Sequence, residues 1–156
     1  MYQEIYGCTL IHQSKYIDKG NLYVGGIKSL DYIKKYQFGA IISAIEKLDK
    51  QIPEYIHHFR IVAYDETNFN LSEYFEQTNS FIKQHLEKTN VLVHCQVGVS
   101  RSVSILIAYF IKEMNMNFDI ALQYIKDKRE FVYPNEGFQD QLHQYYLKCK
   151  DNSKID

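Results

Sequence analysis

One segment near the middle of the chain restricts the possible folds more than any other feature of the sequence. A wholly apolar run of three residues is typical of a strand buried on both faces. A long apolar stretch that ends at Met114 predicts a central helix over 102–114. The strand, the residues that follow it and the first residue of the predicted helix are Val91-Leu92-Val93-His94-Cys95-Gln96-Val97-Gly98-Val99-Ser100-Arg101-Ser102. The segment therefore predicts a buried strand, a short loop and a helix in direct succession.

The predicted loop between Cys95 and Arg101 is suited to holding an anion. Its backbone N–H groups can turn inward, and with the helix N-terminus they attract negative charge. Gly98 permits a close backbone approach, and Arg101 adds a planar guanidinium that can hold two oxygens of a phosphate. The same charges favour the thiolate of Cys95 over its thiol. We therefore expect Cys95 to act as a nucleophile beneath a bound phosphorus.

The rest of the sequence predicts an α/β domain with a central, mostly parallel sheet of about five strands flanked by helices. The expected strands are 22–24, 40–45, 57–63 and 91–93. The expected helices are 30–36, capped by Ser29, then 71–86, introduced by a capping box of Asn70 and Glu73, and 102–114, 118–129 and 137–148. We expect one domain over 1–150 and a flexible tail at 151–156.

The central segment matches the His-Cys-x5-Arg signature of cysteine-dependent phosphatases, and its Gly-x-Ser-Arg-Ser ending resembles the dual-specificity protein phosphatase branch. Three further motifs resemble that family in the family's order: Leu22-Tyr23-Val24-Gly25, Asp65 followed by Phe69-Asn70-Leu71, and Pro134-Asn135-Glu136-Gly137-Phe138. The resemblance covers residues 20–147. It implies the cysteine-phosphatase fold and a small, atypical member of the branch.

The resemblance also implies roles for individual residues. Cys95 would form a cysteinyl-phosphate, Arg101 would bind the phosphoryl oxygens, and Asp65 would serve as general acid and then as general base. Ser102 would assist departure of the thiolate, and His94 and Asn135 would hold the shape of the loop. The phosphate-binding loop would comprise Gln96, Val97, Gly98, Val99, Ser100 and Arg101.

The residues alone leave alternatives to these roles open. Asp49 and Glu66 are rivals of Asp65, because aspartate and glutamate are common in loops. Ser102 also fits a plain residue of a first helical turn, and Asn135 after Pro134 also fits a purely structural helix N-cap.

Composition excludes several classes of function. The formal net charge is −1, from 18 basic and 19 acidic residues, so we expect no nucleic-acid partner. No apolar run is long enough for a transmembrane helix, no secretion signal is visible, and Tyr2 replaces the glycine that myristoylation needs, so we expect no membrane anchor.

The cysteines and histidines show no spacing typical of a metal site. Cys8, Cys95 and Cys149 are odd in number and contain no Cys-x-x-Cys, so we expect no disulfide framework, metal or cofactor. A free nucleophilic thiol suits a reducing compartment, and we predict a cytoplasmic location, with the nucleus as the alternative. A role for Cys8 or Cys149 in oxidation of the site is left open, and the sequence does not place residues 1–20.

The predicted partners are phosphorylated proteins, and the sequence leaves the oligomeric state open, with a monomer as the default. No basic residue occupies the variable loop positions, which favours singly phosphorylated side chains over more anionic groups. The chain has no tryptophan and therefore lacks the Trp-Pro-Asp loop of the large tyrosine-specific enzymes, so the resemblance implies action on phosphotyrosine and on phosphoserine and phosphothreonine. Alternatives are the same chemistry on a phosphoinositide, a glycan phosphate or RNA, a catalytically silent phosphate-binding module, and a sulfur-transferring enzyme.

Overall fold

The fold is an α/β sandwich with a mixed sheet whose order is β1-β2-β5-β3-β4 in a computed structural model that describes residues 6–155. The strands are β1 (Cys8–His12), β2 (Leu22–Gly25), β3 (Phe38–Ala44), β4 (His57–Ile61) and β5 (Asn90–His94). β1 runs antiparallel to β2, and the other neighbours are parallel. The predicted mostly parallel sheet is confirmed, although β1 was not predicted.

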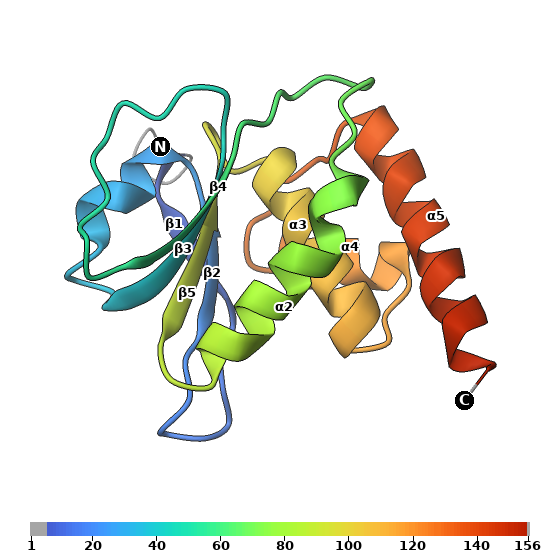
Figure 1. Cartoon of the computed structure of the whole chain (residues 1–156), viewed down its shortest axis with the longest axis horizontal. Helices are drawn as coiled ribbons and strands as arrows, with labels where there is room; N and C mark the ends of the chain where they lie inside the picture. Colours follow the sequence, from blue (N-terminus) through green and yellow to red (C-terminus); the bar gives the residue numbers. More distant parts are fainter. Residues whose placement is uncertain (1–5, 156) are drawn as a thin grey trace.

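The helices lie on both faces of the sheet. They are α2 (Phe75–Leu86), α3 (Arg101–Glu113), α4 (Phe118–Lys126) and α5 (Glu136–Ser153), with 3-10 helices η1 (Ile27–Tyr32) and η2 (Ser72–Tyr74). Helices α2 to α5 cover one face, and η1 lies on the other (Figure 1). Each face has its own apolar core: the larger surrounds α3, and the smaller joins η1 to residues such as Ile41 and Leu92.

Helix α3 is the central helix that the apolar stretch predicted. All its side chains from Arg101 to Ile111 are buried except Tyr109, because α2, α4 and α5 enclose it against the sheet. A helix that is apolar on most of its surface belongs in such a position. Its N-terminus follows directly from β5, which lies between β2 and β3. The loop that joins them is therefore held at the middle of the sheet's carboxyl edge.

Several predicted boundaries are wrong. The helix expected over 30–36 is the 3-10 helix η1, which begins after Gly26, so Ser29 lies inside it and does not cap it. The capping box at Asn70 does not form: the Asn70 carboxamide oxygen accepts a hydrogen bond from the Ser72 hydroxyl at 2.6 Å, and a turn of 3-10 helix precedes α2.

Helix α5 also extends beyond its prediction. It continues to Ser153 where the prediction ended at 148, so residues 151–153 of the expected tail are helical, while residue 156 lies outside the described residues. Lys150 near its end donates to the Asn115 side chain at 2.7 Å, which ties the last turns to the end of α3. None of the helices in the described part of the chain combines the length and apolar character that a bilayer crossing requires.

Candidate active site

The candidate site lies in the loop between His94, the last residue of β5, and Arg101, the first residue of α3. In Figure 1 the segment after β4 and the start of α5 lie at the same end of the molecule as this loop. The sheet order and the two helix N-termini thus bring three separate parts of the chain to one edge, where ligands of open α/β sheets bind.

Carbonyl groups of the loop point away from its concave side. The acceptor–donor pairs are Gln96 O with Ile27 N (2.9 Å), Val97 O and Gly98 O with the Arg129 guanidinium (3.1 and 2.9 Å), and Val99 O with Tyr133 N (2.9 Å). The chain contains no cis peptide in the described residues, and in a trans peptide the N–H points opposite to the C=O. The amides of residues 97–100 are therefore directed inward, as an anion requires.

The Cys95 sulfur lies inside this ring of amides. Sγ accepts a hydrogen bond from Gly98 N at 3.2 Å and is 3.1 Å from the Ser102 hydroxyl. The side chain is buried, yet its sulfur contacts polar groups. Gly98 has φ +75°, and a Cβ there would lie 2.5 Å from the carbonyl carbon of Gly25. The loop can therefore curl around the sulfur only with glycine at position 98.

Arg101 is buried with part of its guanidinium unpaired. Its Nη1 donates to the Ala63 carbonyl at 2.9 Å and to the Glu46 carboxylate, whereas Nε is buried without a hydrogen-bond partner. A buried unpaired donor is costly, and a ligand oxygen would satisfy it. The pKa of the Glu46 carboxylate is lowered by a hydrogen bond from its own backbone N–H and then by Arg101. This carboxylate accepts from Nη1 and so orients the guanidinium of Arg101. Sequence analysis did not identify Glu46.

Arg129 is a second buried guanidinium that sequence analysis missed. Besides the two loop carbonyls it donates to the Thr9 hydroxyl at 2.9 Å, and burial lowers its pKa to about 10 although the nearby Cys95 thiol counteracts this. The chain has only three arginines among 18 basic residues. Each of them donates hydrogen bonds to backbone carbonyls around this edge of the sheet. Arg60 donates to the carbonyls of Ile45 and Ile61. The scarcity of arginine was the signal that could have identified Arg129.

Asn135 links α5, the loop and Asp65. Its side-chain oxygen accepts from Phe138 N at 2.9 Å and caps α5, while its Nδ2 donates to Asp65 Oδ1 at 2.9 Å. Its backbone N–H donates to the Ser100 hydroxyl at 2.9 Å. Asn135 therefore caps α5 and also contacts Asp65 and Ser100. Asp65 itself is exposed, so it can meet a substrate from outside.

The rivals of Asp65 lie differently. Asp49 pairs with Lys47 at 3.4 Å on the exposed surface, whereas Glu66 follows Asp65 and its backbone carbonyl accepts from Phe69 N at 3.1 Å. The other expected site residues are neighbours in space as they are in the sequence: His94, Cys95, the loop, Arg101 and Ser102.

Among residues 6–155, no three His, Cys, Asp or Glu side chains are grouped to hold a metal ion.

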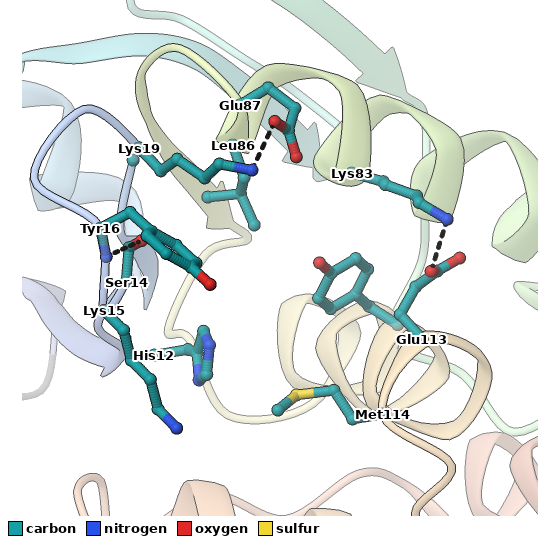
Figure 2. A pocket seen from close by; sticks show the side chains of 12 residues that line it. His12, Ser14, Lys15, Tyr16, Lys19, Lys83, Leu86, Glu87, Glu113 and Met114 are labelled. Atoms are coloured by element: carbon teal, nitrogen blue, oxygen red, sulfur yellow. Dashed lines mark hydrogen bonds and ion pairs between the residues drawn. The ribbon is translucent and has the colours of Figure 1, made fainter.

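Figure 2 shows the residues that line a separate hollow of about 410 Å³. Its wall includes His12 at the end of β1, the Lys19–Glu87 pair and the Lys83–Glu113 pair. Glu113 is the last residue of α3, a 13-residue helix and therefore about 20 Å long, and Arg101 is the first. The hollow is thus remote from Cys95 and takes no part in the candidate site.

The sequence profile of the dual specificity phosphatase catalytic domain matches residues 22–148, which run from the start of β2 into α5. The chain belongs to the dual specificity phosphatase family. Phosphatase chemistry at a cysteine is implied for the family as a whole. The profile therefore agrees with the resemblance drawn from the His-Cys-x5-Arg segment.

Individual dual specificity phosphatases show the same relationship. The chain is 36% identical over 128 residues to a Slingshot protein phosphatase homologue of Xenopus laevis, covering 80% of this chain and 18% of that protein. It is 31% identical to dual specificity protein phosphatase 1B of Arabidopsis thaliana, covering 85% of this chain and 81% of that protein. The crystal structure of DUSP15 aligns with TM-score 0.77 and 26% identity over 93% of this chain and 96% of that one.

Coverage of the relatives is uneven. The chain spans between about a sixth and a third of the length of several curated relatives that it matches, the Slingshot homologue among them. What such longer proteins do as wholes therefore belongs to them. The shared part is the domain that carries the Cys95 loop.

Proposed function

We propose that the protein removes phosphate from phosphotyrosine and from phosphoserine and phosphothreonine in proteins, without a metal or cofactor, through a cysteinyl-phosphate on Cys95. The observation that carries this proposal is the contact of the Cys95 sulfur with Gly98 N–H and the Ser102 hydroxyl beside the partly unpaired guanidinium of Arg101. Inward amides and a free guanidinium donor complement a phosphoryl group that gains charge in the transition state.

The first chemical step transfers the phosphoryl group to sulfur. The Cys95 thiolate attacks phosphorus, an S–P bond forms, and the P–O bond to the substrate breaks as the Asp65 carboxylic acid gives its proton to the leaving oxygen. Arg101 Nε and the loop amides bind the phosphoryl oxygens. The hydrogen bond from Asn135 holds Asp65 near the leaving oxygen and leaves Oδ2 for the proton.

The second step restores the enzyme. The Asp65 carboxylate takes a proton from water, the water oxygen bonds to phosphorus, and the S–P bond breaks to give phosphate and the Cys95 thiolate. The Ser102 hydroxyl, 3.1 Å from the sulfur, can donate a hydrogen bond to the thiolate as it leaves. The one carboxyl group therefore acts first as acid and then as base.

The charges around the loop support a protein substrate that is phosphorylated once. The guanidinium groups of Arg60 and Arg129 are engaged with backbone carbonyls, so they are not directed at further phosphates. Glu46 and Asp65 instead place carboxylates beside the site, which disfavours polyanionic lipids and RNA. Tyr64 and Tyr133, which lie just before Asp65 and Asn135 in the sequence, are both exposed and offer aromatic surface to a polypeptide.

A substrate panel tests the proposal. The protein in EDTA is assayed with phosphotyrosine, phosphoserine and phosphothreonine peptides, a phosphoinositide, a phosphorylated glycan and a 5′-triphosphorylated RNA. We expect turnover of the peptides, inhibition by vanadate and loss of activity in Cys95→Ser. Preferred turnover of the lipid, glycan or RNA would replace the substrate class, and binding of phosphopeptide without turnover would identify a silent binding module.

The proposal extends to the setting of the enzyme. Cys95 stays reduced, and so nucleophilic, in a reducing compartment, so we propose a location in the cytoplasm or nucleus. A monomer is the default expectation for the chain. Fractionation of cells that express the tagged chain and light scattering of the purified protein test these two statements.

A further inference from the structure

A chain of three hydrogen bonds joins the exposed edge of the sheet to the backbone of Cys95. His58 Nε2 on β4 is 2.8 Å from the Ser43 hydroxyl on β3, and that hydroxyl is 2.6 Å from His94 Nε2 on β5. His94 Nδ1 is in turn 3.1 Å from the Cys95 carbonyl oxygen. Ser43 and His94 are fully buried, whereas His58 is exposed. The three side chains therefore span the parallel strands in one line.

Only one arrangement of protons satisfies this chain. The Cys95 carbonyl can only accept, so His94 Nδ1 must carry a hydrogen. Burial lowers the pKa of His94 to about 4, so at neutral pH its Nε2 is a bare acceptor. The single proton of the Ser43 hydroxyl must then go to His94, and the Ser43 oxygen must accept from His58 Nε2–H. His58 is thus the donor at the exposed end of the chain.

Burial, and then positive charges around the chain, lower the pKa of both imidazoles and favour their neutral forms. After burial, the largest cause, Arg60 lowers the pKa of His58, while His58, Arg60 and Arg101 lower that of His94. Arg60 faces the chain from β4 itself, Arg101 from α3, and the Glu46 carboxylate is bonded to Arg101. A neutral His94 with its proton on Nδ1 is what the carbonyl of Cys95 needs.

We propose that His58 and Ser43 are positioning residues for Cys95, holding His94 in the tautomer that donates to the Cys95 carbonyl. The proposal rests on the proposed function, since it assigns to Cys95 the attacking sulfur. Without the donor at position 58, the Ser43 hydroxyl is free to rotate, and His94 Nε2 loses its fixed donor. The carbonyl that anchors the first residue of the loop would then lose its donor for part of the time.

The neighbouring histidine offers a matched control. His57 is on the same strand, but alternate residues of a strand point to opposite faces, and its ring packs on His85 with centroids 4.6 Å apart. Leucine at position 57 and leucine at position 58 therefore remove the same chemical group from the same exposed strand. Only the second change breaks the hydrogen-bond chain.

The test compares His58→Leu, His58→Gln and His57→Leu in the full chain. Glutamine keeps an N–H donor that can reach the Ser43 oxygen. With p-nitrophenyl phosphate we expect His58→Leu to lower kcat about tenfold with little change in KM, as loss of an orienting partner does. His58→Gln should recover most of the rate, and His57→Leu should match the unchanged protein. Equal activity of His58→Leu and His57→Leu, or equal loss in His58→Leu and His58→Gln, would overturn the proposal.

A second measurement does not depend on turnover. The rate at which iodoacetate alkylates Cys95 is followed against pH by mass analysis of the peptide that contains it, so Cys8 and Cys149 do not interfere. We expect the profile to shift in His58→Leu and to return in His58→Gln. If the protein hydrolyses no phosphate ester, the proposed function fails, and the alkylation profile still decides whether His58 positions Cys95. A profile unchanged by His58→Leu would refute that positioning role.

Discussion

Asn135 donates a hydrogen bond from Nδ2 to Asp65 Oδ1 at 2.9 Å while its own side-chain oxygen caps α5. One side chain therefore couples the start of a helix to the carboxyl group proposed as the acid. The exposed loop that carries Asp65 gains a fixed point on a rigid element. This contact separates two effects that mutation of the residue would otherwise combine.

Serine at position 135 should separate capping from acid positioning. Serine is a good N-cap, so Asn135→Ser should stay within about 1 kcal/mol of the original stability, while Asn135→Ala loses the cap as well. Both variants lack the donor to Asp65. We expect kcat in Asn135→Ser to fall about tenfold for an alkyl phosphate, whose leaving group needs a proton, and much less for p-nitrophenyl phosphate. An equal loss for the two substrates would contradict the role of the contact.

Glu46 should be needed for its oxygen and not for its charge. In Glu46→Gln an amide oxygen can still accept from Arg101, so we expect kcat/KM within about threefold of the original value. In Glu46→Ala the buried guanidinium keeps only the Ala63 carbonyl and loses the carboxylate that orients it, so kcat/KM should fall at least about tenfold. Asp49→Ala, which breaks only the surface pair with Lys47, is the control. If alanine and glutamine at position 46 give the same kcat/KM, Glu46 does not orient Arg101.

Arg129 should not be replaceable by lysine. The guanidinium donates to Gly98 O, Val97 O and the Thr9 hydroxyl at once, and a single ammonium cannot reproduce that geometry. We expect both Arg129→Lys and Arg129→Met to lower the free energy of unfolding by about 2–4 kcal/mol, measured by urea denaturation. Vanadate should also bind more weakly to both. Full recovery of vanadate affinity in Arg129→Lys would show that charge alone organises the loop.

The burial of His94 predicts a loss of stability in mild acid. Its pKa is about 4 in the folded protein against 6.5 for the free side chain. Between these values the unfolded chain takes up a proton that the folded chain refuses, so the stability contributed by the neutral imidazole is complete above pH 6.5. It is lost as the pH falls towards 4, by up to about 3 kcal/mol.

His94→Gln provides the comparison for this pH dependence. Urea midpoints at pH 7 and pH 5 should differ less in the variant than in the original protein. His12, His58 and His85 also have lowered pKa values, but they remain in the variant and cancel in the comparison. An identical pH dependence in the two proteins would show that His94 does not stay neutral in the fold.

The residues of the loop could be predicted because the chemistry there is local. Cys95, Gly98 and Arg101 lie within seven consecutive positions, so strand, loop and helix follow from one stretch of sequence. Glu46, Arg129 and His58 reach the same site from distant segments. Their contacts exist because β3 pairs with β5 and because the chain after α4 returns to the loop. Nothing in the local pattern around those residues indicates that order of strands.

The errors in the fold have a similar cause. The Ser72 N–H donates to the side-chain oxygen of Gln141 on α5 at 2.9 Å, and the Gln141 Nε2 donates to the Phe69 carbonyl at 2.8 Å. These contacts from α5 set the path of the segment before α2, so the local capping signal at Asn70 is overridden. β1 is a five-residue edge strand next to β2, and its short sequence gives no distinctive alternation.

The engagement of the loop carbonyls by Arg129, Ile27 and Tyr133 has a consequence for how the protein uses binding energy. The conformational entropy of these peptides is lost once, when the chain folds, because their partners belong to the protein itself. An oxyanion that arrives finds its donors already aimed, so little of its attraction is consumed in ordering them. That attraction remains to stabilise phosphorus as it moves between oxygen and sulfur.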